Sequence, residues 1–453
     1  MKKNKVLVMH IFVILISLLL FNVLSDDMIK FKEVYLLLIY AYTMYTANIF
    51  VDYINSYMIF LYTLGLFNFS RIALDLLDYA RIGWATKFAN YYFCTSVVNE
   101  IIYVFLICLL FIHLGFLIAI KTSKLDFDIT IKRDEVNIQF SKIVFIVFSF
   151  MLAIKLFIQF KAILAYGYNA YYTGILRNIE YPSYTYASGT IMTIAFIIFL
   201  VSKPEKSEFL IFSSIYLLVK LLDSLKGARA IFLTQFLFIF WYYVKAYKPK
   251  IRYRDLFKIF GFILAFSQIL VSFREKKLFS LKIITSIENF FFSQGVSYLV
   301  LGYTIDLKER IANKLYIIQG IFGFKPQGQE ALNTTNSLPD VLTYMLDPKA
   351  YIKGEGIGSN FIAESYFLGY FLMIILFVIL GYLIVKYEIY VGKYRILLML
   401  SAYLIPNLFY IPRGSLFGGG LLKFIGIYIL VPLIIMKGLN LWKEYLELPT
   451  TSG

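Results

Sequence analysis

The chain has 453 residues, of which 60% are hydrophobic and 16% charged, with a formal net charge of +16 and only two Cys and two His. Soluble domains are nearer ~25% charged and ~45–50% apolar, so this composition excludes a soluble enzyme, a disordered chain and a disulfide scaffold. His10 and His113 lie in long apolar runs, and Cys94 and Cys108 are isolated, so no metal-ligand pattern is present. A membrane protein that works with oxygen and nitrogen groups, without a metal or cofactor, is therefore predicted.

Apolar runs long enough to cross a bilayer recur along most of the chain. A hydrocarbon core of ~30 Å needs ~20 mostly apolar residues per helix. The runs predict an all-α, polytopic membrane protein with about twelve spans. They are 6–24, 34–51, 53–69, 98–120, 142–164, 187–202, 208–223, 230–247, 255–273, 364–386, 395–411 and 418–437. The first run lacks a small-residue cleavage site, so we expect a retained span and not a signal peptide.

Lys and Arg in the short loops set the predicted orientation. The predicted cytoplasmic segments are 1–5, 121–142, 203–206, 245–258, 386–395 and the C-terminal tail. They hold about twice as many Lys and Arg as the short outer loops, so both termini are predicted to be cytoplasmic. This topology places 224–229, 274–363 and 411–417 on the outer side. Much of the +16 charge is thereby explained, and no basic soluble domain supports nucleic-acid binding.

One large non-spanning segment, 274–363, follows the ninth predicted span. It opens with FREKKLFSLKIITSIENFFFSQGVSYLVLGYTI, whose apolar and aromatic residues predict a helix lying in the membrane interface. A second amphipathic segment, DLKERIANKLYIIQGIF, follows, and the Gly- and Pro-containing remainder is predicted to be an ordered loop. We expect a single integral membrane domain over 1–453, with this loop covering an opening for a lipid-linked substrate.

Three arginines stand at the outer membrane boundary of this topology. Arg229 lies in LKGARA, Arg274 in VSFREKK and Arg413 in IPRGSL. Guanidinium groups bind phosphate oxygens in a bidentate fork and remain charged at physiological pH. If the three converge, they would bind a lipid-carried diphosphate, with Lys226 and Lys277 as further contacts; otherwise each reaches lipid headgroups independently.

A second group of candidates lies in GEGIGSNFIAESYFLGYF, residues 354–371. Ser359 and Asn360 stand at a predicted helix start, where backbone N–H groups can hold an anion, although a plain loop is equally open. Glu364 is a general base or a hydroxyl-positioning group, or else it pairs with an arginine or with the helix dipole. Tyr366 is a candidate substrate contact. Asp340, Asp347 and Glu355 are the alternative bases.

The outer loop 165–188 is rich in tyrosine. An aromatic belt at the membrane surface accounts for most of these residues. Aromatic rings also stack on sugars, so glycan contacts are the alternative for Tyr168, Tyr171, Tyr172 and Arg177.

These features together resemble the oligosaccharide repeat-unit polymerases (O-antigen polymerases) of bacterial envelopes. The likeness covers the whole chain by architecture. By motif it covers 224–230 (LKGARA), 272–298 (FREK to FFSQGVSY), 337–371 and 410–416 (IPRGS). It implies a GT-C-like helical membrane glycosyltransferase in the inner membrane, acting on undecaprenyl-diphosphate-linked oligosaccharides at the periplasmic face without a metal. By position, it implies that Arg229, Arg274 and Arg413 bind the diphosphate, with a less secure role for Glu364.

The resemblance leads to an expected reaction and to expected partners. A sugar hydroxyl would attack the anomeric carbon of the growing chain, with inversion, and the lipid diphosphate would leave. Membrane lipids, a chain-length regulator and a flippase are the expected partners. The alternatives are a flippase for lipid-linked oligosaccharide and a ligase that transfers finished glycan. Transporters usually have two related halves, and no such internal repeat is detectable in this sequence. Ligases are expected to carry a histidine in an outer loop, whereas His10 and His113 both lie in long apolar runs.

Overall fold

A computed structural model gives the fold. It describes residues 2–79, 84–85, 91–123, 128–166, 179–224, 229–252, 254–255, 258, 261, 265, 283–311, 314–325, 327–334 and 337–447.

The regular secondary structure of the described residues is helical apart from one short ladder, in which β1 (Trp84–Ala85) pairs antiparallel with β2 (Tyr91–Tyr92). In the N-terminal half, the helices are α1 (Lys2–Val23), α2 (Ile29–Asn48), α3 (Ser56–Leu64), the π-helix η1 (Gly65–Phe69), α4 (Ser70–Leu76), α5 (Thr95–Lys121), α6 (Glu135–Tyr166), η4 (Ser183–Thr185), α7 (Ser188–Val201), α8 (Lys206–Ser224) and α9 (Arg229–Tyr247). In the C-terminal half, they are α11 (Ile283–Gln294), α12 (Val296–Asp306), η5 (Lys308–Arg310), η6 (Tyr316–Ile318), α13 (Gln319–Phe322), α14 (Gln329–Thr334), α15 (Leu338–Leu346), α16 (Pro348–Ile352), α17 (Phe361–Tyr366), α18 (Gly369–Tyr390), α19 (Arg395–Tyr410), η7 (Ile411–Arg413), α20 (Leu421–Ile425), the π-helix η8 (Gly426–Leu430) and α21 (Val431–Glu447).

Within these ranges, 8 helical stretches are long and apolar enough to cross a membrane. They are Lys3–Val23, Ser56–Leu76, Thr95–Lys121, Glu135–Ala165, Ser183–Val201, Gly369–Tyr390, Arg395–Arg413 and Leu421–Leu441. Each overlaps a predicted span, so the chain is a polytopic, helical membrane protein. The predicted spans 34–51, 208–223 and 230–247 form α2, α8 and α9, which fall outside this set, and 255–273 lies largely outside the described residues. The total of twelve stays a prediction.

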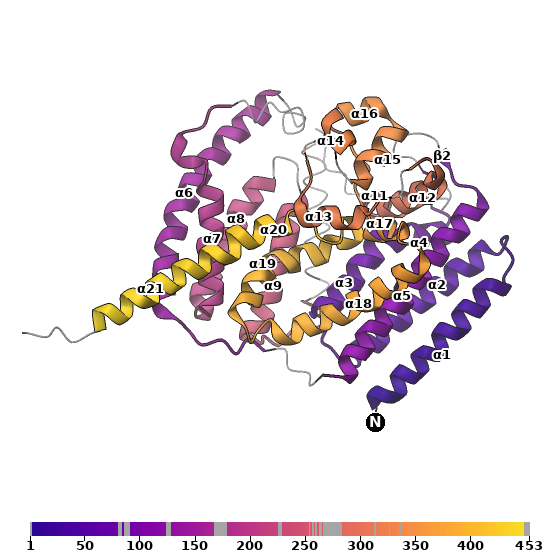
Figure 1. The fold of residues 1–453 in the computed structure, drawn as a ribbon, viewed down its shortest axis with the longest axis horizontal. Helices are drawn as coiled ribbons and strands as arrows, with labels where there is room; N and C mark the ends of the chain where they lie inside the picture. Colours follow the sequence, from indigo (N-terminus) through magenta and orange to yellow (C-terminus); the bar gives the residue numbers. More distant parts are fainter. Residues whose placement is uncertain are drawn as a thin grey trace, which may run out of the picture. The chain divides into compact units, whose positions relative to one another are not determined.

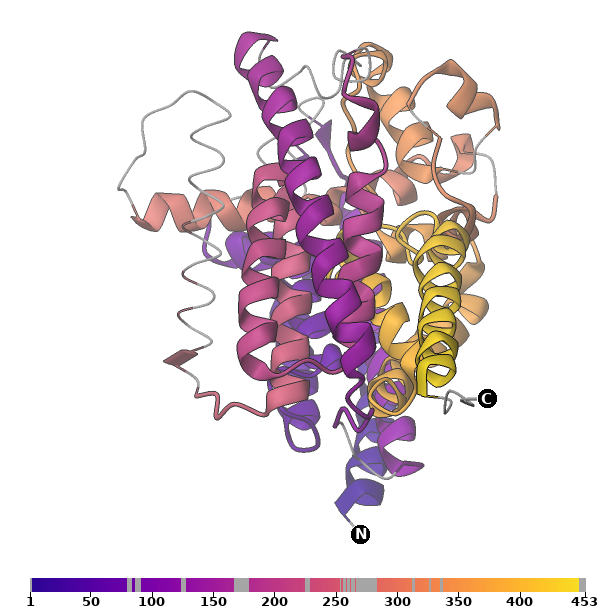
Figure 2. The ribbon, with the colours of Figure 1, turned by 90° about the vertical axis from the view of Figure 1, so that its left-hand side faces the viewer.

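The helices form two compact units. The first comprises Met1–Asp126, Leu278–Ile389 and Asn407–Gly420, and the second Phe127–Lys277, Tyr390–Pro406 and Leu421–Gly453. In the second unit, α6 packs against α7 and α8, and α8 against α9 (Figure 2).

In the first unit, α5 is the central helix. It packs against α1 and α2 (Figure 1), and most of its residues are buried. It crosses α18 closely enough that glycine is needed on both helices. A Cβ built on Gly115 would lie 2.0 Å from the Val378 carbonyl oxygen, and one on Gly381 would lie 1.9 Å from that of Ile112. Small residues allow such backbone approach between membrane helices.

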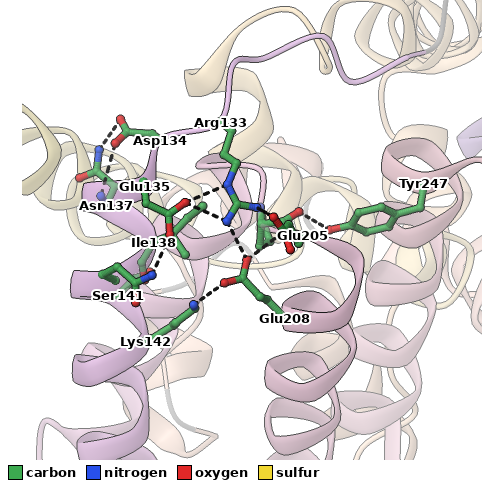
Figure 3. A network of polar contacts seen from close by, with 12 residues as sticks. Arg133, Asp134, Glu135, Asn137, Ile138, Ser141, Lys142, Glu205, Glu208 and Tyr247 are labelled. Carbon is green, nitrogen blue, oxygen red and sulfur yellow. Dashed lines mark hydrogen bonds and ion pairs between the residues drawn. The ribbon is translucent and has the colours of Figure 1, made fainter.

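A network of charged side chains joins helices of the second unit (Figure 3). The Arg133 guanidinium lies 2.8 Å from the Glu135 carboxylate and 3.3 Å from that of Glu208, which also contacts Lys142. Between described residues of this unit, Lys248 also pairs with Asp128 at 2.5 Å and Arg395 with Asp134 at 3.5 Å. These contacts join parts of the predicted cytoplasmic segments 121–142, 203–206, 245–258 and 386–395, and Glu208 at the start of the predicted span 208–223.

The segment predicted as a large outer loop is mostly helical where it is described. α12 is buried from Ser297 to Thr304 and packs against α5, η1 and α17. A helix at the membrane interface would expose an apolar face to lipid. α12 is instead buried within the protein, so the prediction of an interfacial helix is wrong for residues 296–306. The second predicted amphipathic segment forms short turns and helices, η5, η6 and α13, while α14, α15 and α16 occupy the predicted ordered loop.

The structure also differs from the prediction at the start of the span 364–386. The short helix α17 ends at Tyr366, and the membrane-length helix α18 begins only at Gly369. Glu364 therefore lies on a separate helix that precedes the span.

Candidate functional site

Four segments distant in sequence meet in the first unit. They are the π-helix η1, the junction of α11 and α12 at 294–297, the start of α17 at 359–364, and the loop 411–415. Three of them carry the motifs FFSQGVSY, GSNFIAES and IPRGS. Parts of 274–363 and 411–417, two segments that the sequence places on the same side of the membrane, are therefore adjacent among the described residues. π-Helical turns such as η1 occur frequently at functional sites.

Two buried asparagines hold these segments together. Asn360 caps α17, where its side-chain oxygen accepts the Ile362 N–H. Its Nδ2 donates to Asn68 Oδ1 at 2.8 Å and to the Ser297 carbonyl oxygen at 2.9 Å. Asn68 Nδ2 in turn donates to the Pro412 carbonyl oxygen at 3.1 Å. Because buried amides are costly when unpaired, this arrangement fixes η1, α12, α17 and the 411–415 loop relative to one another.

Glu364 is almost fully buried, with 1% of its surface exposed. Its Oε1 accepts hydrogen bonds from the hydroxyls of Ser359, at 2.6 Å, and of Ser415. Its Oε2 has no hydrogen-bond partner among the described residues. Burial raises the pKa of Glu364 to about 7, while the two hydroxyls and the Leu416 N–H act in the opposite direction. A carboxyl group with such a pKa can exchange a proton near neutral pH.

Arg413 lies two residues before Ser415 and is half-buried. Its Nη1 donates to Gln294 Oε1, and its guanidinium carbon lies 5.6 Å from the centre of the Phe67 ring. It makes no ion pair with a carboxylate in the part of the chain that is described. The Arg413 guanidinium is therefore contacted by the Gln294 amide and the Phe67 ring, and its other N–H groups can donate to an anion.

The remaining arginine predictions fall largely outside what the structure describes. Arg229 is the first residue of α9, in the second unit, and its side chain is not described. The other positions outside the described residues are Tyr168, Tyr171, Tyr172, Arg177, Lys226, Arg274 and Lys277. Convergence of Arg229, Arg274 and Arg413 therefore stays a prediction.

Three other predicted residues of the α17 region have defined partners. Ser359 binds Glu364, and Asn360 serves as the helix cap, so the Ile362 N–H is already bonded within the protein. Tyr366 contacts other residues than Glu364 and Arg413. Its hydroxyl donates to Glu100 Oε1 at 2.9 Å, and the Lys308 ammonium lies 4.7 Å from its ring centre.

The alternative carboxylates are placed less favourably than Glu364. Asp347 caps α16 by accepting the N–H groups of Lys349 and Ala350, and Glu355 is exposed. Asp340 is half-buried on α15, and burial raises its pKa, countered in part by Ser337. Of the four candidates, Glu364 alone contacts the 411–415 loop through a hydrogen bond between described residues.

Sequence reasoning missed Asn68, Gln294 and Arg71 as members of this region. Asn68 falls inside the predicted span 53–69, where a polar residue is uncommon and could have served as a signal. Arg71 is 4% exposed, and its guanidinium lies 3.9 Å from the Phe292 ring centre. Nothing in the spacing of the sequence relates Asn68 to Asn360, because the contact depends on the tertiary fold.

The two histidines have structural partners. His113 bonds the Thr46 hydroxyl at 2.7 Å and the Tyr57 hydroxyl at 3.1 Å, and His10 bonds the Leu110 carbonyl oxygen. Within the described ranges, no group of three or more His, Cys, Asp or Glu side chains could hold a metal ion.

Comparison with known proteins gives one result. A family model described as O-antigen polysaccharide polymerase Wzy matches residues 6–444. Neither the curated proteins nor the solved structures give a match. Because the family match spans nearly the whole chain and includes all four converging segments, the chain belongs to the O-antigen polysaccharide polymerase Wzy family.

Proposed function

We propose that this protein joins undecaprenyl-diphosphate-linked oligosaccharide repeat units into O-antigen or a related surface polysaccharide, by inverting transfer at the periplasmic face of the bacterial inner membrane. The family match supports the polymerase activity. The observation that carries the mechanism is that Arg413 and Glu364 belong to one set of connected segments, linked through Ser415 and the two buried asparagines.

In the proposed reaction, a hydroxyl oxygen of one lipid-linked repeat unit attacks the anomeric carbon of the growing chain. The bond from that carbon to the lipid diphosphate breaks, and the diphosphate leaves with both bonding electrons. Arg413 stabilises the developing negative charge, together with Arg229 and Arg274. Glu364 accepts the hydroxyl proton, for which its unbonded Oε2 is suited. The orientation of both termini toward the cytoplasm belongs to the same proposal.

The proposed roles predict that replacing either Arg413 or Glu364 abolishes polymerisation. Arg413→Ala removes the fork that contacts the leaving group, and Glu364→Gln keeps the size of the side chain but cannot accept the proton. Both variants are expected to insert into the membrane and to leave single repeat units on the surface glycan. Arg310→Ala, at an exposed arginine of the same unit, is the matched control and should restore full polymer.

The test is complementation of a deletion strain, with surface glycan resolved on a gel. Loss of a polymerase leaves single repeat units, loss of a flippase leaves none, and loss of a ligase leaves polymer on its lipid carrier. A deletion strain that lacks even single units would replace the polymerase proposal with the flippase alternative. Polymer of normal length in both site variants would refute the assigned roles.

A further inference from the structure

A short segment of the first unit exposes large apolar side chains, although it lies outside the membrane-length helices. This apolar segment, residues 314–325, contains η6, α13 and the residues around them. Its Tyr316 and Ile317 are buried, whereas Phe322 is 68% exposed and Leu315 54% exposed, and Phe324 is exposed as well. The apolar segment therefore has one side packed against the protein and one apolar side that the described residues leave open.

The packed side is fixed beside the ends of two membrane-length helices. The Gly320 carbonyl oxygen accepts the Gly420 N–H at 2.7 Å, and the next residue, Leu421, begins a membrane-length stretch. The Tyr316 ring centre lies 4.9 Å from that of Phe367, two residues before the first residue of α18. Both helix ends are predicted to lie on the outer side of the membrane. The apolar segment is therefore held at the predicted outer boundary of the bilayer.

The charges around the apolar segment match a lipid surface. Its sequence, KLYIIQGIFGFK, has a lysine at each end, and no acidic residue occurs from 311 to 329. Lys314 is exposed, and Lys325 pairs with the exposed Glu330 at 2.8 Å, a kind of pair that contributes little. Segments that lie in the membrane interface bury their apolar side chains at the acyl boundary and place basic residues at anionic headgroups. A bilayer surface thus satisfies both the apolar side chains and the flanking lysines.

We propose that residues 314–325 insert into the outer leaflet of the membrane. Leu315, Phe322 and Phe324 lie at the acyl boundary, and Lys314 contacts the headgroups. Through the hydrogen bond between Gly320 and Gly420, the inserted segment holds the end of the 411–420 loop at the level of the headgroups. This inference is independent of the polymerase reaction, because it follows from exposure, packing and charge.

The test measures the depth of spin labels in liposomes of phosphatidylethanolamine and phosphatidylglycerol. Phe322→Cys and Leu315→Cys are made separately in full-length protein that carries Cys94→Ser, which removes the exposed native thiol and leaves the buried Cys108. Molecular oxygen concentrates in hydrocarbon, whereas a hydrophilic nickel chelate stays in water. The ratio of oxygen to nickel collisions should be several-fold higher at both positions than at a water-exposed position, and should indicate a depth of about 5–10 Å.

Ile352→Cys in the same Cys94→Ser protein is the matched control. Ile352 is 76% exposed on α16 of the same unit, and α16 lies farther than α13 from the N-terminal end of α1 (Figure 1). Its label should collide mainly with the nickel chelate. The Cys94→Ser protein without an introduced cysteine gives the background from Cys108. Dilution with unlabelled protein shows whether a second copy of the chain covers the labelled face, because insertion into lipid gives a signal that dilution does not change.

Three results would overturn the proposal. Labels at 315 and 322 that collide with the nickel chelate as often as the label at 352 would place the segment in water. Labels that neither reagent reaches would show that protein covers the face. A signal that changes on dilution would assign the face to contact between copies of the chain. Because both replaced side chains are exposed, the two cysteine variants are expected to fold, and either one alone is sufficient for the measurement.

Discussion

Glu364 is predicted to make the protein less stable as the pH rises. Its pKa is raised from an ordinary value of 4.5 to about 7 by burial. Between these two values, the folded protein keeps the proton that the unfolded chain has lost. The folded state therefore binds more protons, and the free energy of unfolding falls with increasing pH. Below 4.5 both states are protonated, and above 7 both are ionised, so the change is confined to this window.

The magnitude follows from the pKa difference. One pKa unit corresponds to ~1.36 kcal/mol, so the shift amounts to roughly 3 kcal/mol lost between pH 4.5 and pH 7. Glu364→Gln has no charge to bury and should lack this decline. The variant should therefore match wild type near pH 4.5 or fall below it, and gain on wild type as the pH rises. Stability gained with activity lost is typical of an active-site residue.

The assay is thermal or denaturant unfolding of the full-length protein in one detergent, at fixed ionic strength, from pH 4.5 to pH 8.5. The quantity to compare is the difference between Glu364→Gln and wild type at each pH. Glu355→Gln, at an exposed carboxylate in the preceding loop, is the control and should follow wild type. A difference that is constant with pH, or one in which wild type gains on the variant as the pH rises, would refute the burial of an ionisable Glu364.

Three further predictions test the site and its scaffold. Asn360→Ala removes a helix cap, the donor to the buried Asn68 Oδ1 and a second hydrogen bond to the Ser297 carbonyl oxygen, so it should lower the free energy of unfolding by about 2–4 kcal/mol, measured by unfolding of the purified protein. Ser415→Ala removes a donor to the Glu364 carboxylate; it should raise the pKa of Glu364 by about one to two units and move the acid limb of activity upward by the same amount, in a pH–rate profile with lipid-linked substrate. Arg133→Ala breaks a largely exposed network in the second unit, so it should change stability by less than about 1 kcal/mol and leave polymer length unaltered on the glycan gel.

The membrane helices follow from the sequence because each depends on local composition. An apolar run of about twenty residues must satisfy its backbone internally, and a helix is the simplest way to do so. The predicted spans 98–120 and 142–164 are accordingly found as α5 and α6. The start of α18 is harder to predict. The apolar residues around Glu364 continue the hydrophobic sequence of the span without a break, but they form a separate short helix, α17, that ends before α18 begins.

α12 shows where composition alone fails. An apolar helix with scattered polar residues is compatible with the membrane surface and equally with the inside of a protein. Its actual place depends on α5 and η1, to which Ser297 and its neighbours pack, and no pattern within 296–306 records those partners.

The candidate site was accessible from sequence only in part. Arg413 and Glu364 could be selected because charged residues near a membrane boundary require an explanation. Their connection depends on Asn68 and Asn360, which are 292 residues apart and meet only in the fold. Arg71 could not be distinguished from any arginine near the end of a span until its contact with Phe292 and the lack of a side chain on Gly295 placed it at the α12 junction.

The measurement that tests the central claim most directly is the surface glycan of a deletion strain complemented with wild type, Arg413→Ala or Glu364→Gln. The account predicts long polymer with wild type and only single repeat units with either variant, at equal amounts of membrane-inserted protein. Long polymer with both variants, or in the deletion strain itself, would contradict it.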